Sequence, residues 1–244
     1  MHIKLTLKPR EKSYIELPLY YNYLLQGLIY KNIFPELAEF LHNEGFCFKK
    51  RRFKMFSFSR LQGVFRINAE KKTIVFEDSA ELVISTPLTE LSQSLGDFIL
   101  KDNFRLGKEQ IVIDGFEMKD CIVRDDSIIL RTLSPVTAYS TATLPDGSKY
   151  TIYYNPQEKR FEEIINNNLR KKYYALNGEE APEYSVHLKI KSKPKLNIVK
   201  FKGIIIKGYT FNMELTGPTE LLQLAVDTGL GGKNSQGFGC VEMM

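Results

Sequence analysis

Tryptophan does not occur among the 244 residues, and cysteine and histidine occur only three times each. Because Cys47, Cys121 and Cys240 are odd in number and have no paired spacing, we expect no disulfide framework and a reducing compartment. The histidines are isolated from one another and from the cysteines, so their spacing predicts no zinc site. We therefore expect neither a metal nor a cofactor.

Long apolar runs are also missing, and no stretch approaches the roughly 18 residues of a membrane-spanning helix. The first residues alternate between apolar and polar and lack the apolar centre of a signal peptide. We therefore expect a cytoplasmic protein without membrane contact. Apolar residues make up 43% and charged residues 26% of the chain, which is typical of folded domains, and the net charge of +5 favours an acidic partner.

The spacing of apolar residues predicts helices and strands in a similar order in both halves of the chain. In the first half we expect strands at residues 2–8, 55–59, 64–68, 73–77, 80–85 and 110–118, and helices at 20–33, 35–42 and 86–100. In the second half we expect strands at residues 127–133, 147–154, 186–191, 200–215 and 238–243, and helices at 155–174 and 218–228.

Two successive β-α-β-β-α-β patterns predict an α+β fold with two tandem ferredoxin-like domains, the architecture of RNA-recognition domains, packed side by side. The sequences of the halves do not repeat, so we expect only the topology to be duplicated. We place the boundary so that the domains are residues 1–122 and 123–244. Because no flexible linker is present, we expect the domains to pack firmly, with a groove between them.

A glycine-rich segment, residues 229–239, precedes the last expected strand and contains five glycines in eleven residues. Such a cluster persists where the backbone needs positive φ angles or where another group approaches it closely. Its backbone N–H groups, together with Lys233, can form a phosphate-binding loop. The P-loop and dinucleotide motifs are excluded, because Asp227 and Asn234 occupy positions that those motifs reserve for glycine, serine or threonine. A tight helix-to-strand turn is the alternative, but it does not require so many glycines.

A basic segment, residues 49–54, contains five cations in six positions and leads into an expected strand. It is either a solvated loop or a patch that binds RNA phosphates, for which binding would depend steeply on salt concentration. We favour the phosphate-binding interpretation because the segment follows closely on a helix that ends in His42.

The pattern Gly-x-Gly-x-Lys-Asn-Ser-x-Gly-x-Gly, placed between a helix and the last strand, resembles the glycine-rich signature of the CRISPR-associated repeat-processing endoribonucleases, the Cas six family. Shorter segments also resemble motifs of that family, in the family's order: Leu25–Tyr30, Phe40–His42, Phe53–Phe58 and Arg131–Pro135. The matching segments extend over most of the chain. Each of the N-terminal segments alone is weak, but together with the glycine signature they are specific.

The resemblance implies a metal-independent endoribonuclease that cleaves CRISPR precursor RNA within its repeats. The family's tyrosine, histidine and lysine roles fall on Tyr30, His42 and Lys54. In such a reaction the neighbouring 2′-OH attacks the phosphate and leaves a 2′,3′-cyclic phosphate and a 5′-OH. His42 is then a general acid or base, Tyr30 positions the 2′-OH or assists proton transfer, and Lys54 stabilises the phosphorane. Without the resemblance, His42 would be a cation at a helix end and Tyr30 a core residue.

We expect the repeat RNA to be bound by the basic segment, by the glycine-rich segment and by two further cations: Lys49, Lys50, Arg51, Arg52, Arg131, Lys202, Gly231, Lys233, Asn234, Ser235, Gly237 and Gly239. A homodimer and the CRISPR interference complex are further partners that the resemblance leaves open. The alternative function is a catalytically inactive repeat-RNA-binding subunit of a CRISPR ribonucleoprotein complex. A general RNA-recognition protein is disfavoured, because its characteristic aromatic strand motif is missing.

Overall fold

The computed structural model describes residues 1–98 and 104–244. The N-terminal half is built on an antiparallel sheet with the strand order β5-β8-β1-β10-β9. Its strands are β1 (His2–Pro9), β5 (Ser57–Phe58), β8 (Ala80–Ser85), β9 (Phe104–Leu106) and β10 (Glu109–Lys119). The helices of this half are α1 (Asn22–Lys31), α2 (Pro35–Asn43) and α3 (Thr89–Phe98).

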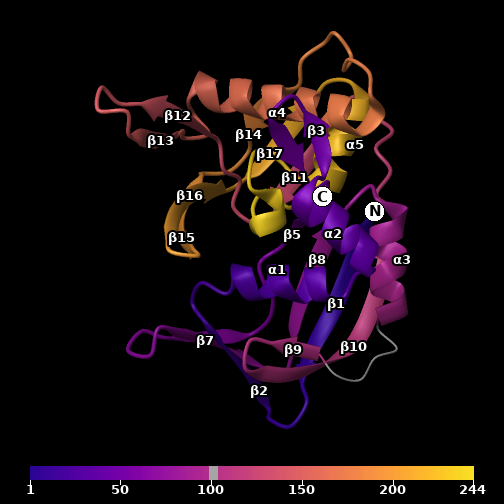
Figure 1. Ribbon diagram of the computed structural model, residues 1–244, viewed down its shortest axis with the longest axis vertical. Coiled ribbons are helices and arrows are strands. Elements are labelled where there is room, and N and C mark those ends of the chain that lie inside the picture. Colours follow the sequence, from indigo (N-terminus) through magenta and orange to yellow (C-terminus); the bar gives the residue numbers. More distant parts are fainter. Residues whose placement is uncertain (99–103) are drawn as a thin grey trace.

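Two smaller sheets complete the N-terminal half. One has the order β2-β7-β6 and consists of β2 (Tyr14–Pro18), β6 (Phe65–Asn68) and β7 (Thr73–Glu77). The other is a hairpin of β3 (Phe46–Phe48) and β4 (Arg51–Phe53). In Figure 1 this hairpin extends away from its own half and reaches α4 of the other half, where the Phe48 and Tyr174 rings meet edge to face at 5.3 Å.

The C-terminal half contains an antiparallel sheet with the order β14-β17-β11-β18, made of β11 (Ser127–Thr132), β14 (His187–Ile190), β17 (Asn212–Thr216) and β18 (Val241–Met243). Two hairpins project from it (Figure 1): β12 (Tyr139–Thr143) with β13 (Lys149–Tyr153), and β15 (Lys195–Phe201) with β16 (Ile204–Thr210). The helices are α4 (Lys159–Asn177), α5 (Thr219–Thr228) and the short 3-10 helix η1 (Asn234–Gln236). Within residues 1–98 and 104–244, no helix combines the length and the apolar content that a membrane crossing needs.

The two main sheets have the same connectivity. If the central strands of each half are numbered along the chain, β5-β8-β1-β10 and β14-β17-β11-β18 both read 2-3-1-4. Between the first and second strands lie two helices, α1 and α2, in the N-terminal half and one, α4, in the C-terminal half; α3 and α5 lie between the third and fourth strands. The predicted α+β class and the division into two halves are therefore confirmed.

Alternation and helical spacing explain where the two cores lie. Ile3, Leu5 and Leu7 of β1 point to one face of the first sheet and are buried there, as a period of two requires. In the second half, Phe161, Ile165 and Leu169 recur every four residues along α4 and pack against α5. Burial of each such side chain contributes about 1.5–3 kcal/mol.

Most predicted elements are present, but the strand expected at residues 200–215 is wrong. β15 ends at Phe201, the chain turns through Lys202 and Gly203 at φ angles of 46° and 87°, and β16 and β17 follow. The apolar alternation continues through both arms of the hairpin and therefore conceals the turn. The helix expected at 155–174 begins only at Lys159, because residues 155–158 form a turn closed by their own side chains.

Other boundaries also differ from the predictions. The strand expected at 55–59 is shortened to β5, because Met55 has a φ of 52° and interrupts it. The end of the helix expected at 86–100 lies outside the described residues, while α3 occupies Thr89–Phe98. The short strands β2, β3, β4, β9 and β12 were not predicted, and the strand expected at 200–215 covers only the last two residues of β15.

The glycine-rich segment forms one junction between the halves. The Asn22 amide of α1 donates to the carbonyl oxygens of Gln236 and Gly237 at 3.0 and 3.2 Å. The Gln26 amide, one turn further along α1, donates to the Ser235 carbonyl oxygen at 2.7 Å. Because the acceptors belong to the backbone, this junction depends on the path of the segment.

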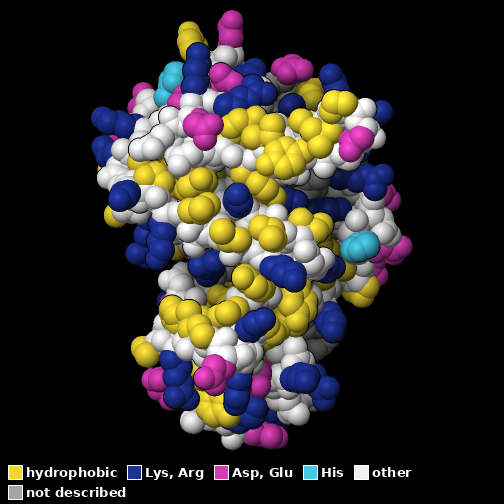
Figure 2. All heavy atoms as spheres, turned by 90° about the vertical axis from the view of Figure 1, so that its left-hand side faces the viewer, with side chains coloured by type: hydrophobic (Ala, Val, Ile, Leu, Met, Phe, Trp, Pro, Cys, Tyr) yellow, Lys and Arg dark blue, Asp and Glu magenta, His cyan; other side chains and the backbone are white. Residues whose placement is uncertain are grey.

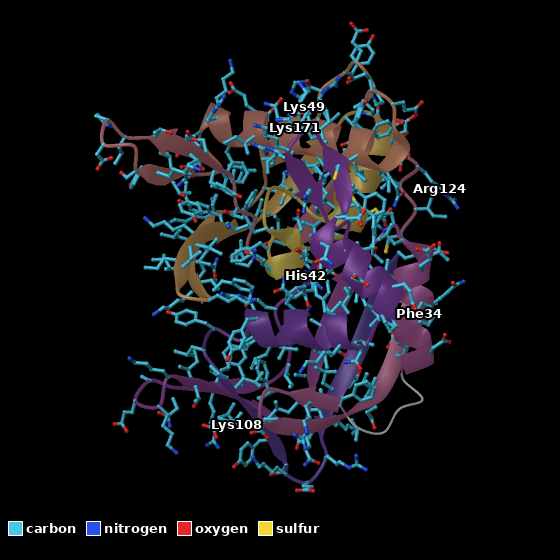
Figure 3. The ribbon with its side chains drawn as sticks, in the orientation of Figure 1. Phe34, His42, Lys49, Lys108, Arg124 and Lys171 are labelled. Carbon is cyan, nitrogen blue, oxygen red and sulfur yellow. The ribbon has the colours of Figure 1, made fainter. Side chains whose placement is uncertain are left out.

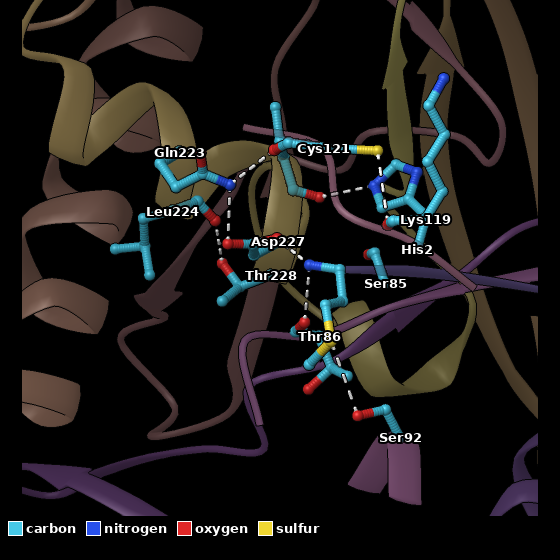
Figure 4. A network of polar contacts seen from close by, with 12 residues as sticks. His2, Ser85, Thr86, Ser92, Lys119, Cys121, Gln223, Leu224, Asp227 and Thr228 are labelled. Atoms are coloured by element: carbon cyan, nitrogen blue, oxygen red, sulfur yellow. Dashed lines mark hydrogen bonds and ion pairs between the residues drawn. The ribbon is translucent and has the colours of Figure 1, made fainter. Parts of the chain in front are cut away.

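A second junction joins β1 to α5 (Figure 4). The Met1 amino group lies 2.5 Å from Asp227 Oδ1 and also donates to the Thr86 carbonyl oxygen. His2 Nε2 lies 3.2 Å from the carbonyl oxygen of Val226, and Gln223 links Asp227 to the Cys121 carbonyl oxygen. The two junctions, together with the β3–β4 hairpin, hold the halves firmly together, as the missing linker predicted.

We expect Gly237→Ala to weaken the first junction. A Cβ at Gly237 would lie 2.5 Å from the Phe58 ring and 2.6 Å from the Asn22 amide. Gly147→Ala is the matched control, since Gly147 also has a positive φ but open space around it. The control should lose about 1–2 kcal/mol of unfolding free energy, from backbone strain alone. Gly237→Ala should lose about 1–3 kcal/mol more, from overpacking.

Urea denaturation followed by circular dichroism measures both losses. Equal losses in the two variants would contradict the close packing at Gly237.

Candidate active site

Tyr30, His42 and Lys54 lie together, although they come from three different elements. Tyr30 is near the end of α1, His42 is near the end of α2, and Lys54 follows β4. The Tyr30 and His42 rings meet edge to face with centroids 6.4 Å apart, and Lys54 Nζ donates to the His42 carbonyl oxygen at 3.0 Å. His42 is exposed.

The end of α2 orients the His42 imidazole. Its Nδ1 lies 2.9 Å from Asn43 Oδ1, which is an acceptor, so Nδ1 carries the hydrogen and Nε2 is left for a ligand. Arg52 donates to the Asn43 carbonyl oxygen, and Lys54 donates to that of His42. Two cations therefore stabilise the C-terminal end of this helix, where the backbone carbonyls concentrate negative potential.

Burial changes the pKa of the Tyr30 phenol and of the Lys54 ammonium. It raises the pKa of the Tyr30 phenol to about 12, and the ring packs edge to face against Phe56 at 5.8 Å. The phenol is therefore protonated at neutral pH and can donate a hydrogen bond, but it cannot act as a base there. Burial, helped by the nearby Arg52 charge, lowers the pKa of Lys54. Its ammonium is therefore partly desolvated, which strengthens its attraction for an anion.

A cavity of about 770 Å³ lies between the halves next to this group of residues. Residues 51–56 form its wall on the N-terminal side, and β12, α4 and residues 232–236 form its wall on the C-terminal side. Seven cations are among the described residues that line it: Arg51, Arg52, Lys54, Arg160, Lys171, Lys172 and Lys233. No Asp or Glu is among those residues. The cavity therefore attracts anions, and an anion bound there relieves the repulsion between the cations.

One stripe of α4 supplies much of this lining. Arg160, Ile164, Asn168 and Lys171 recur every three or four residues and so project from one side of the helix. In Figure 3 Lys171 lies beside Lys49, and burial together with the Arg51 and Lys49 charges lowers its pKa. The sequence analysis missed Arg160, Lys171 and Lys172. The repeat of polar residues along this amphipathic helix was the available signal.

Lys172 connects α4 to the start of the glycine-rich segment. It is buried, and its Nζ lies 2.7 Å from the Gly229 carbonyl oxygen, 3.2 Å from that of Thr228 and 3.1 Å from Thr228 Oγ1. The Thr228 hydroxyl donates its own hydrogen to the Leu224 carbonyl oxygen, so all three neighbours accept from Lys172 and match its ammonium form. Burial lowers the pKa of Lys172, to about 7.

The glycine-rich segment is closed by Asn234. Its amide Nδ2 donates to the carbonyl oxygens of Leu230 and Phe238 at 3.0 and 3.1 Å, so this side chain organises the loop from within. Lys233 has a φ of 62° and holds its Nζ 5.2 Å from the centroid of the Tyr139 ring, at the cavity wall. Ser235 also lines the cavity.

The glycines Gly231, Gly237 and Gly239 are buried and are not among the described residues that line the cavity. A Cβ at Gly231 would overlap the Thr137 carbonyl oxygen, and one at Gly239 would overlap that of Leu230. At these positions glycine is required because backbone or side-chain atoms of the protein itself approach the segment closely.

The remaining predicted RNA-binding residues are not among the described residues that line the cavity. Lys49 and Lys50 are exposed in the turn between β3 and β4, and Lys202 is exposed in the turn between β15 and β16. Arg131 forms an ion pair with Glu242 across β11 and β18. On the face seen in Figure 2, Lys and Arg side chains cross the middle of the molecule, while many Asp and Glu side chains lie toward its two ends.

Two α+β halves with a cation-lined cavity between them define a protein suited to an extended anionic ligand. The family model described as "CRISPR-associated protein Cas6, N-terminal" matches residues 16–117 of this chain. The family model described as "CRISPR associated protein Cas6, C-terminal" matches residues 117–243. The chain therefore belongs to the Cas6 family of CRISPR-associated endoribonucleases, as the sequence motifs predicted.

Individual proteins are similar to this chain over nearly its full length. The CRISPR-associated endoribonuclease Cas6 1 of Methanocaldococcus jannaschii is 28% identical over an alignment 243 residues long, which covers 98% of this chain and 92% of that protein. A solved CRISPR associated protein Cas6 is 27% identical and covers 100% of this chain and 99% of its own, with a TM-score of 0.81. "An RAMP protein binding different RNA substrates", at 19% identity, covers 100% of this chain and 99% of its own with a TM-score of 0.84, and so shares the fold.

We expect Asn234→Ala to lower the unfolding free energy by about 1–3 kcal/mol, because two partly buried carbonyl oxygens lose their donor. Ser235→Ala is the matched control, because the Ser235 side chain is next to Asn234 in the sequence and lines the same cavity wall without closing the loop. This control should change the unfolding free energy by less than about 0.5 kcal/mol. Thermal melting monitored by circular dichroism distinguishes the two. Equal melting temperatures would show that Asn234 does not hold the segment together.

Proposed function

We propose that the protein cleaves CRISPR precursor RNA within its repeats, without a metal ion, to release guide RNAs. The observation that supports this proposal best is the meeting of Tyr30, His42 and Lys54 next to a cavity lined by cations. A protein that only binds RNA needs cations, but it does not need a histidine with a free Nε2 beside a protonated phenol.

The three side chains divide the reaction between them. The 2′-OH next to the scissile phosphate attacks phosphorus, the bond to the 5′ oxygen breaks, and the products carry a 2′,3′-cyclic phosphate and a 5′-OH. His42 exchanges a proton through Nε2, either with the attacking 2′-OH or with the leaving 5′ oxygen. Tyr30 donates a hydrogen bond that positions the reacting groups, and the Lys54 ammonium stabilises the charged phosphorane.

The cavity binds the RNA backbone in this proposal. Arg51 and Arg52 from one half, and Lys171 and Lys233 from the other, line the cavity and would neutralise phosphates of the bound strand. Binding then releases counterions, so affinity should fall steeply as the salt concentration rises. Lys54 lines the cavity and also belongs to the catalytic group, which connects phosphate binding to the reaction.

We further propose that each half is a ferredoxin-like domain, with residues 1–122 and 123–244 as the two units. The shared strand order 2-3-1-4, with a helix after the first and the third strand, supports this assignment. The two core clusters support a change of unit close to this boundary, because one ends at Ile111 and the other begins at Cys121, two residues before position 123.

We expect His42→Ala to lower the rate of repeat-RNA cleavage by about 10²- to 10⁴-fold, because the proton-transfer group is lost. RNA affinity should change little, since His42 is not among the described residues that line the cavity. His187→Ala is the matched control, because His187 is an exposed histidine of the other half that contacts Glu162. A gel assay on repeat RNA in excess EDTA measures cleavage, and filter binding measures affinity.

The same assay includes a repeat RNA with a 2′-deoxy substitution at the scissile nucleotide, which removes the nucleophile and should abolish cutting. Tight binding without cleavage by the wild-type protein would favour the alternative, a catalytically inactive subunit that holds repeat RNA in a ribonucleoprotein complex. Cleavage of the deoxy substrate would contradict 2′-OH attack.

We expect Tyr30→Phe to slow cleavage by about 10- to 100-fold, because a positioning hydrogen bond is lost. Its pH–rate profile should keep the wild-type shape, since burial raises the phenol pKa to about 12 and the group stays protonated through the neutral range. Tyr23→Phe, on the exposed side of the same helix, is the control and should leave the rate unchanged. A Tyr30→Phe profile that loses a limb in the neutral range would mean that Tyr30 titrates as the base.

A further inference from the structure

Two buried polar atoms at the cavity have no hydrogen-bond partner among the described residues: Thr137 Oγ1 and Asn168 Oδ1. Both residues line the cavity between the halves, and both are more than nine-tenths buried, with exposed fractions of 1% and 7%. A buried acceptor without a partner costs about 1–3 kcal/mol, so native proteins rarely retain one without a use.

The chemistry of Asn168 narrows the choice of ligand. An amide oxygen only accepts hydrogen bonds, and phosphate oxygens are acceptors as well, so an RNA phosphate cannot satisfy it. The ligand group must therefore carry an N–H or O–H. In RNA the ribose 2′-OH and the nucleobases do. A carboxamide, with a donor beside its acceptor, can pair with a base edge through two hydrogen bonds at once, which favours a base as the ligand.

The surroundings also suit a base. The cavity of about 770 Å³ is in the size range of pockets for small molecules, roughly 300–1,000 Å³, so it suits one or two unpaired nucleotides rather than a duplex. Tyr139 adds an aromatic ring to the same wall, and unstacked bases of single-stranded RNA commonly stack on such rings. Asn168 is carried by the long helix α4, next to the core residue Leu169, so its backbone is well fixed. Its Oδ1 is itself closed to solvent, so it meets a base only after the amide turns about χ2, a torsion that has a broad range in asparagine.

We propose that the cavity takes an unstacked base of the RNA and that Asn168, assisted by Thr137, reads its hydrogen-bonding edge. This inference rests on the proposed function, because it assumes that the ligand is RNA. Adenine is the base whose adjacent donor and acceptor pair best with an asparagine amide. Asn168 is then a specificity-determining residue, whereas the cations around it bind phosphates without regard to sequence.

The test compares binding of short oligo(A), oligo(C) and oligo(U) RNAs, by fluorescence anisotropy at one salt concentration. The wild-type protein should prefer oligo(A). Asn168→Leu, which keeps the size of the side chain, should lower oligo(A) affinity by about 5- to 100-fold and leave the other two nearly unchanged. Lys171→Ala is the contrasting variant, and it should weaken all three RNAs alike and reduce the salt dependence by about one phosphate contact.

Thermal melting distinguishes whether Asn168 reads a base or has only a structural role. Because Asn168 Oδ1 has no partner in the described residues, Asn168→Leu breaks no hydrogen bond of that oxygen and should not lower the melting temperature. A lower melting temperature with an unchanged preference for oligo(A) would overturn the proposal and show that the amide is held by buried water.

The outcomes also distinguish this inference from the proposed function. If the protein cuts repeat RNA in a His42-dependent way but binds the three oligonucleotides equally, base reading by Asn168 is wrong and the endoribonuclease assignment stands. If the wild-type protein neither binds these RNAs nor cuts repeat RNA, both are wrong.

Discussion

The structure depends on the close approach of the protein's own atoms to the backbone of residues 229–239. A Cβ at Gly231 or Gly239 would overlap a carbonyl oxygen, and one at Gly237 would press on the Phe58 ring of the other half. Only glycine lets the segment lie this close while its carbonyl oxygens accept hydrogen bonds from α1. Residues 232–236 form part of the cavity wall, so the cavity exists only because this packing is possible.

Repulsion between cations is a second constraint, and it opposes the close packing of the two halves. Closing the halves brings Arg51 and Lys49 of the β3–β4 hairpin next to Lys171 of α4, and burial, together with the repulsion of those two charges, lowers the pKa of Lys171. Apolar contacts such as the edge-to-face pair of Phe48 and Tyr174 oppose the repulsion and keep the hairpin in place. A protein built in this way is stabilised further when a polyanion occupies the cavity, because the ligand neutralises charges that the fold holds together.

Local sequence patterns predicted much of the fold, because alternation and helical spacing are imposed by which side of an element faces the core. The strand expected at 200–215 failed because both arms of the β15–β16 hairpin alternate in the same way, and Gly203 was the only local mark of the turn. The predicted Tyr30, His42 and Lys54 do meet. By contrast, Tyr139 gave no signal, since a cavity wall is created by residues far apart in the sequence that meet only after folding.

The position of Lys54 explains why the two halves would be needed together. It is the one member of the proposed catalytic group that lines the cavity within the described residues, and its Nζ is bonded to the His42 carbonyl oxygen. A strand of RNA held by α4 and the glycine-rich segment would therefore meet the catalytic group at Lys54, with a phosphate already close to His42. In the proposed reaction most of the chemistry belongs to one half and much of the binding surface to the other. The junctions at Asn22 and Asp227 fix the distance between them, so they would control the alignment of the scissile phosphate although neither residue contacts it.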